Sequence, residues 1–190
     1  MSARDNILNR LRSVAIAEVN KPQLAISPIR YEEKVLHFAE MVKAVGGAVV
    51  EMQDSLNATL ATLLDREMTI VSPLAKLQGK AINPDEVADV HELGGEYAAV
   101  VRGEIGVAEN GAVWIPVEGC RKAHLFACKH LVIVLNRQTV VDTMHDAIEN
   151  ISLDKLAYGA FVSGPSKTAD IEQALVMGAH GAMCTTVILY

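Results

Sequence analysis

Residues 163–172, SGPSKTADIE, concentrate residue types that could bind a small anionic ligand. They follow a strand-like run at Ala160–Val162, and the helical spacing after them predicts that they open the last helix of the chain. Free N–H groups at a helix start bind anions, and a glycine lets the backbone approach a ligand closely. We therefore expect a ligand-binding loop made by Ser163, Gly164, Ser166, Lys167 and Thr168.

The same segment also has an interpretation that needs no ligand. Thr168 can act as the N-cap of the predicted helix, and Asp170 and Glu172 in its first turn would complement the helix dipole. Those two carboxylates would repel a phosphate, which Lys167 only partly offsets. Asp170 is instead a candidate catalytic carboxylate, because it could orient a hydroxyl or a lysine.

Glu109 is the second candidate for a catalytic carboxylate. It precedes Asn110-Gly111, a dipeptide that favours a tight hairpin turn, so a solvated glutamate beside a plain turn is one interpretation. In the other, the turn holds Glu109 in a cleft as nucleophile or general base, with Asn110 and Gly111 contacting the ligand. Glu104 is a weaker candidate for the same role.

His180 lies in a glycine-rich segment, residues 178–181, between the predicted last helix and the last strand. A regular helix would place this loop at the opposite edge of the sheet from the loop at Ser163. Capping of the helix and packing of the loop therefore stand beside ligand binding as roles for His180.

The elements that must position these residues alternate between helix and strand. Helical spacing predicts a helix in the first twenty residues, and the predicted helices of the body lie within 32–45, 54–64 and 141–151. Short apolar runs predict strands at 48–50, 68–71, 131–135, 160–162 and 185–190. Three strand-like segments with no helix between them, at 88–92, 97–101 and 112–115, predict a β-rich insertion.

This alternation indicates an α/β fold with a mostly parallel sheet, covered by helices on both faces. We expect residues 1–30 to form a helical arm and linker that packs on the body, and residues 31–190 to form one α/β domain. Ligands in open α/β sheets bind beyond the carboxyl ends of the strands. We expect the Glu109 and Ser163 segments to meet there.

Composition excludes several classes of function. A net charge of −6 leaves no basic footprint for nucleic acid, and the longest aliphatic run, Leu131–Leu135, is far shorter than a membrane-spanning helix. The N-terminus has no secretory signal and the three cysteines form no C-x-x-C pair, so we expect reduced thiols and a cytoplasmic protein. Three cysteines cannot alone hold an iron–sulfur cluster that needs four, and His124 and His130 have no recognised zinc spacing, so we expect no metal site.

Four segments, in order across residues 90–190, resemble motifs of the LutC/YkgG family, whose domain is called LUD. Residues 107–112 are similar to its "(I/V)AE-T-GT", residues 130–135 to its "H-(I/L)-x-V" strand, residues 163–172 to its "SGPS(R/K)TADIE" and residues 178–181 to its "G-x-HGP". The chain departs from the family at Asn110, where the family has threonine, and at Ala182, where it has proline.

The resemblance implies a NagB/RpiA/CoA-transferase-like fold and a LutC-like subunit of an iron–sulfur-dependent system that oxidises L-lactate to pyruvate. It implies LutA-like and LutB-like cysteine-rich partners that hold the iron–sulfur clusters, no cofactor bound by this chain alone, and a small organic acid as ligand. The departure at Asn110 makes residues 109–111 similar to the "ENG" of class I CoA-transferases, whose glutamate attacks acyl-CoA. A CoA-transferase-like or sugar-phosphate enzyme using Glu109 is therefore an alternative, and a non-catalytic scaffold or regulator is a third.

Overall fold

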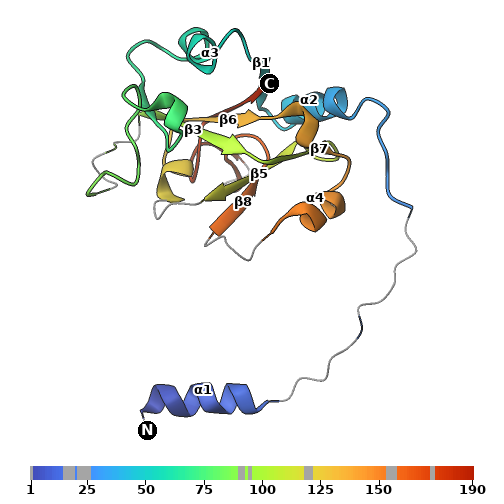
Figure 1. Ribbon diagram of the computed structural model, residues 1–190, viewed down its shortest axis with the longest axis vertical. Helices are drawn as coiled ribbons and strands as arrows, with labels where there is room; N and C mark the ends of the chain where they lie inside the picture. The colour runs from blue at the N-terminus through green and yellow to red at the C-terminus, as the bar shows by residue number, and fades with distance from the viewer. Residues whose placement is uncertain are drawn as a thin grey trace.

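The computed structural model of the protein describes residues 2–14, 20, 27–89, 93, 96–117, 122–152, 158–171 and 174–190, with the backbone alone at 169–171 and 174–175 (Figure 1). The helices are α1 (Ala3–Ser13), α2 (Lys34–Ala44), α3 (Leu56–Leu63) and α4 (Met144–Asn150), with short 3-10 turns η1 (Ala75–Leu77), η3 (Lys122–Leu125) and η4 (Arg137–Thr139). The strands are β1 (Ala48–Glu51), β2 (Thr69–Val71), β3 (Tyr97–Gly103), β4 (Ile105–Val107), β5 (Ala112–Val117), β6 (His130–Leu135), β7 (Val140–Val141), β8 (Tyr158–Val162), β9 (Lys167–Ile171), β10 (Ala174–Met177) and β11 (Cys184–Leu189).

A five-stranded parallel sheet in the order β1-β11-β6-β3-β2 is the centre of the molecule. Its middle strands are runs of buried aliphatic residues, as expected for a parallel sheet that is covered on both faces. The predicted α/β fold with a mostly parallel sheet is confirmed.

The two faces of this sheet are covered differently. On one face, Leu56 and Leu60 of α3 pack in a cluster with alternate residues of β3, β6 and β11. On the other face, Phe38 and Val42 of α2 join a cluster that also contains residues of the second sheet. Figure 1 shows α3 on one side of β3 and β6, and β5 and β8 on the other side. Burial of each such side chain stabilises the fold by about 1.5–3 kcal/mol.

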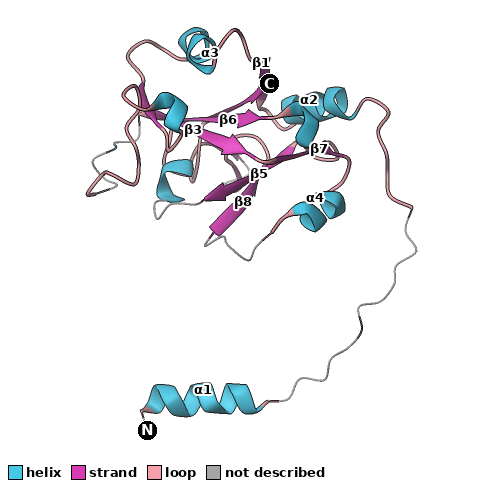
Figure 2. Cartoon of the chain, in the orientation of Figure 1, coloured by secondary structure: helices cyan, strands magenta, loops and turns pink. Residues whose placement is uncertain are grey.

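The second sheet has the order β7-β4-β5-β8 (Figure 2). Of the three segments predicted to form a β-rich insertion, only 112–115 lies in this sheet, as β5, whereas 97–101 belongs to β3 of the parallel sheet. Residues 88–89 are not in a strand, and residues 90–92 lie outside the described residues. Because β5 pairs antiparallel with both β4 and β8, the strand at Ala160–Val162 lies in this layer and not in the parallel sheet. Val141, expected in a helix, instead pairs with β4 together with Val140, and α4 begins only at Met144. Thr143 and Asp146 form a capping box at that start.

The predicted last helix is wrong, because β9 and β10 form an antiparallel hairpin in its place. Thr168 pairs with Val176 and Lys167 with Met177, so Thr168 is not a helix N-cap. Backbone bonds from Gly178 N to the oxygen of Ser166, 3.0 Å, and from Ser166 N to the oxygen of Ala182, 2.9 Å, close the base of this hairpin. β-branched residues such as Thr168 and Val176 favour strands, and the helical spacing between them was coincidental.

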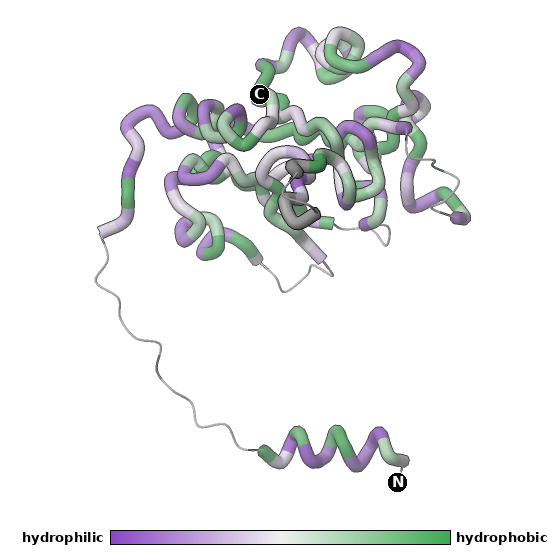
Figure 3. Tube along the Cα trace, turned by 180° about the vertical axis from the view of Figure 1, so that it is seen from behind, coloured by the Kyte–Doolittle hydropathy of each residue, from purple (hydrophilic) through white to green (hydrophobic). Residues whose placement is uncertain are grey.

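The N-terminal helix α1 is present, but the expected packing on the body is not seen. A capping box between Ser2 and Asp5 begins the helix. Ile7, Leu11 and Val14 on its apolar stripe are 60%, 66% and 63% exposed. Figure 1 shows α1 apart from the α/β body, and Figure 3 shows hydrophobic and hydrophilic residues alternating along it. The helices in the described part of the chain lack the length and apolar character of a membrane span.

Candidate functional site

The two predicted motifs meet at Asn110 and Ser163. Ser163 Oγ donates a hydrogen bond of 2.8 Å to the carbonyl oxygen of Asn110. The turn that presents Asn110 joins β4 to β5, as the dipeptide predicted, and Asn110 Oδ1 accepts from the backbone N–H of Ala112 at 3.0 Å. The two segments are thus side by side as expected, but they meet at the amino ends of β1 and β11 and not at the carboxyl ends of the strands.

The turn at Gly111 and the segment at Gly164 both pack closely against the end of α2. Gly111 has φ +66°, and a Cβ there would lie 2.7 Å from the backbone nitrogen of Val42. Gly164 has φ +70°, and a Cβ there would lie 2.7 Å from the carbonyl oxygen of Val45. Lys167 Nζ donates to that same carbonyl oxygen, as lysines near helix C-termini do. We call Gly111, Gly164, Lys167 and the α2 residues they contact the glycine junction.

The loop that carries His180 lies next to the glycine junction, not at the opposite edge of the sheet as expected. The hairpin replaces the predicted helix, so the chain returns at once and the Gly181 backbone comes against the Ser166 side chain. His180 itself is exposed. It lines an open cavity of about 270 Å³ together with Glu96, Phe126 and Lys129.

Glu109 points away from this arrangement. Its backbone N–H donates to the carbonyl oxygen of Asp142 at 3.0 Å, and its Oε2 accepts from the backbone N–H of Met144 at 2.9 Å. The carboxylate therefore caps the start of α4, where a negative charge is favourable. Asp170 lies in β9, and its side chain is outside the described part of the structure.

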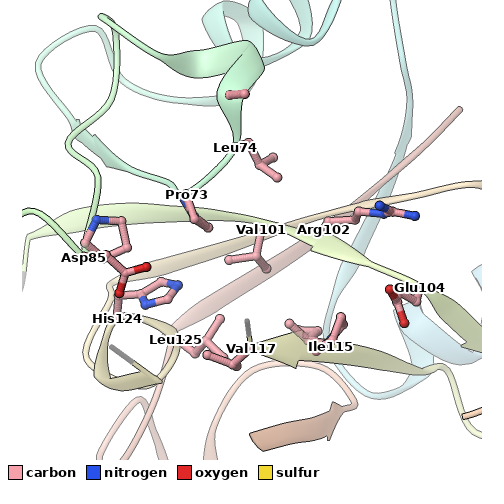
Figure 4. Close-up of a pocket in the computed structure, with 13 residues that line it drawn as sticks. Pro73, Leu74, Asp85, Val101, Arg102, Glu104, Ile115, Val117, His124 and Leu125 are labelled. Atoms are coloured by element: carbon pink, nitrogen blue, oxygen red, sulfur yellow. The ribbon is translucent and has the colours of Figure 1, made fainter. Parts of the chain in front are cut away.

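A cavity that the sequence did not predict lies on the other side of β3. It has a volume of about 210 Å³ and is bounded by β3, β5, η3 and the loop after β2 (Figure 4). Its charged and polar side chains are Asp85, Arg102, Glu104 and His124. Its apolar walls include Pro73, Leu74, Val101, Ile115 and Leu125.

The cavity exists because β2 is shorter than β3. The ladder between the two strands ends at Val71 and Ala99, and Ser72 Oγ then donates to the carbonyl oxygen of Val100 at 2.6 Å. Pro73 follows, so the last residues of β3 have no strand beside them on this side. The opening is at the carboxyl ends of β2 and β3, where open α/β sheets bind ligands.

The two ends of this cavity differ in chemistry. Figure 4 shows Arg102 and Glu104 at one end, and the carboxylate of Asp85 facing the ring of His124 at the other. The guanidinium of Arg102 and the carboxylate of Glu104 have no ion pair or hydrogen bond with any described residue. His124 is 4% exposed, and its carbonyl oxygen accepts from Tyr97 Oη at 3.3 Å.

A signal for this cavity was present in the sequence. Strand β3 reads YAAVVRG, and Arg102 is its one charged residue, at the carboxyl end of a run that is otherwise buried. Glu104 follows two residues later and was considered only as a weaker substitute for Glu109. A charged residue at the end of a buried parallel strand would have indicated the site.

The cysteines and histidines do not form a metal site in the part of the chain that the structure describes. No group of three or more His, Cys, Asp or Glu side chains lies close enough there to hold an ion. Burial raises the pKa of Cys128 to about 11, and its Sγ donates to the carbonyl oxygen of Leu125 at 3.5 Å. Burial likewise raises the pKa of Tyr97 to about 12.

A parallel sheet backed by a second sheet, with a cavity at its carboxyl edge, places the protein in a known α/β class. A crystal structure of a DUF162 family protein from Deinococcus radiodurans has the same fold, with a TM-score of 0.64 over 85% of this chain and 99% of that one, at 15% identity. Residues 97–190 match the LUD domain family. This part of the chain is therefore a LUD domain, and the resemblance to the LutC/YkgG family is confirmed.

A curated relative agrees with this assignment. The protein "Lactate utilization protein C" of Bacillus pumilus (strain SAFR-032) is 32% identical over 98 residues. The match covers 48% of this chain and 41% of that protein, so it spans less than half the length of the relative.

Proposed function

We propose that the protein is a LutC-like subunit of an iron–sulfur-dependent system that oxidises L-lactate to pyruvate in the cytoplasm. The observation that carries the proposal is the LUD domain at residues 97–190, with its motifs in family order. The name of the Bacillus pumilus relative supports the substrate.

In this proposal the electrons pass through partner subunits and not through this chain. Cys128 is buried with its thiol protonated, and a thiol in that state is a poor metal ligand. LutA-like and LutB-like cysteine-rich proteins would hold the clusters, and this chain would contribute binding of the acid and contact with those partners.

The glycine junction and the His180 loop are the proposed surface for this contact. Ser163 and His180 are exposed there, and Asn110 and Gly181 beside them are only partly buried. The glycine junction is closely packed and the cavity beside the His180 loop is open, which suits a protein partner better than an enclosed substrate.

Deletion of the gene in the source organism tests the proposal. We expect growth on L-lactate to be lost, growth on pyruvate to be unchanged, and the tagged protein to copurify with iron–sulfur partners. Normal growth on L-lactate without the gene would show that the proposed function is wrong.

A further inference from the structure

We propose that the cavity between β3 and β5 binds a small 2-hydroxy carboxylic acid, with Arg102 holding the carboxylate and Glu104 accepting a hydrogen bond from the hydroxyl. The assignment of the cavity comes from its own geometry and charges. The choice of a hydroxy acid over other small acids rests also on the proposed function.

Arg102 is a cation without a counter-ion. The guanidinium of Arg30 binds the carboxylates of Asp142 and Asp146, and that of Arg137 binds Glu51. Arg102 has no such partner among the described residues, although Glu104 is two positions away. A planar guanidinium that lines a cavity is suited to bind a carboxylate through two parallel hydrogen bonds.

Glu104 sets the second requirement on the ligand. Its backbone N–H is bonded to the carbonyl oxygen of Trp114 at 2.9 Å, which fixes the residue at the edge of the second sheet. Its ionised carboxylate can only accept hydrogen bonds, so its complement is a donor on the ligand. The ligand therefore carries a carboxylate and a nearby donor group.

Size and polarity narrow this class further. A cavity of about 210 Å³ is smaller than the pockets that hold drug-sized ligands, so it suits an acid of only a few carbons. Apolar side chains such as Val101 and Ile115 form the wall beside Arg102 and Glu104. A neutral hydroxyl is less costly to bury beside them than an ammonium group, which favours a hydroxy acid over an amino acid.

Four acids of three carbons test this assignment, because they differ only at the second carbon. We would titrate the full-length protein with L-lactate, propionate, pyruvate and L-alanine up to roughly 10 mM, with binding followed by NMR. We expect L-lactate to bind at least tenfold more tightly than propionate or pyruvate, which lack the donor. Absence of L-lactate binding, or tighter binding of L-alanine, would overturn the hydroxy-acid assignment.

Variants locate the site. We expect Arg102→Gln to weaken L-lactate binding at least tenfold, and Glu104→Leu, which has no hydrogen-bond acceptor, to remove the preference for L-lactate over propionate. Arg66→Gln is the matched control, because Arg66 is also exposed but lies in the turn before β2, outside the cavity. Unchanged L-lactate binding in a folded Arg102→Gln protein would show that the site is elsewhere.

The growth experiment separates this inference from the proposed function. If L-lactate does not bind but the deletion strain fails to grow on it, the function stands and the assigned site is wrong. If L-lactate binds at Arg102 but the deletion strain grows normally, the site stands and the pathway is wrong.

Discussion

Close contact with the end of α2 explains why residues 111 and 164 of the two motifs are glycines. Their positive φ angles and the backbone of α2 leave no space for a side chain. A glycine-rich motif that suggests a ligand-binding loop from its composition is thus explained, at these two positions, by packing.

Gly111→Ala is expected to destabilise the protein for two reasons. The left-handed backbone costs an alanine about 1–2 kcal/mol, and the overlap with Val42 adds about 1–3 kcal/mol. Gly79→Ala is the control, since Gly79 has φ +80° with no atom within 4 Å of its Cβ position, so it incurs the first cost alone. Equal losses of unfolding free energy in urea titrations of the two variants would contradict the packing role.

Glu109→Gln distinguishes a capping glutamate from a catalytic one. Glutamine keeps an acceptor for Met144 N, so stability is expected to change by less than about 0.5 kcal/mol, whereas Glu109→Ala should lose about 1 kcal/mol. Both variants should support growth on L-lactate. A folded Glu109→Gln protein that fails to support growth, or a covalent adduct on Glu109 after incubation with acyl-CoA, would favour the CoA-transferase-like alternative.

At the scale of elements, the sequence predicts those helices and strands that apolar spacing and capping residues within the segment determine. Helix α3 with Ser55 as its N-cap and strand β6 follow directly from apolar spacing and capping. The β9–β10 hairpin could not be predicted in this way, because the spacing of Ile171, Ala174 and Leu175 fits a helix, while the cross-strand bonds that decide the structure are not local. The same holds for β7, since its two residues become a strand only beside β4.

An ion pair between Arg30, which precedes α2, and Asp146 of α4 depends on pH. The Arg30 hydrogen bonds, at 2.6 and 3.1 Å, and those from Thr143 lower the pKa of Asp146 from 3.8 to about 2. Because the folded-state pKa is the lower one, this stabilisation is complete above pH 3.8 and is lost as the pH falls towards 2. In Arg30→Gln the pKa of Asp146 should rise, measured by NMR of the carboxyl carbon, and the stability difference from the wild type should vanish near pH 2. A difference that persists there would contradict the ion pair as its cause.

At the scale of the whole molecule, Arg102 at the end of β3 is a sequence signal for one end of the cavity. The complete lining could not be predicted, because no continuous stretch of sequence forms it. Asp85, Arg102, Ile115 and His124 come from four separate segments that only the packing of two sheets brings together. The sequence could indicate the carboxyl edge of the sheet as the place for a ligand. It could not indicate that the short strand β2 opens the cavity beside β3.

Helix α1 is expected to contribute almost nothing to the stability of the body. No residue of α1 is buried, so removal of residues 2–14 should change the unfolding free energy of the α/β body by less than about 0.5 kcal/mol. Removal of residues 2–31 should be clearly destabilising, because it also deletes the Arg30 pairs and Tyr31, whose ring stacks on His37 at 4.0 Å. Chemical denaturation of the two truncated proteins checks this. A large loss from the shorter truncation would mean that the apolar stripe of α1 is covered by the body in solution.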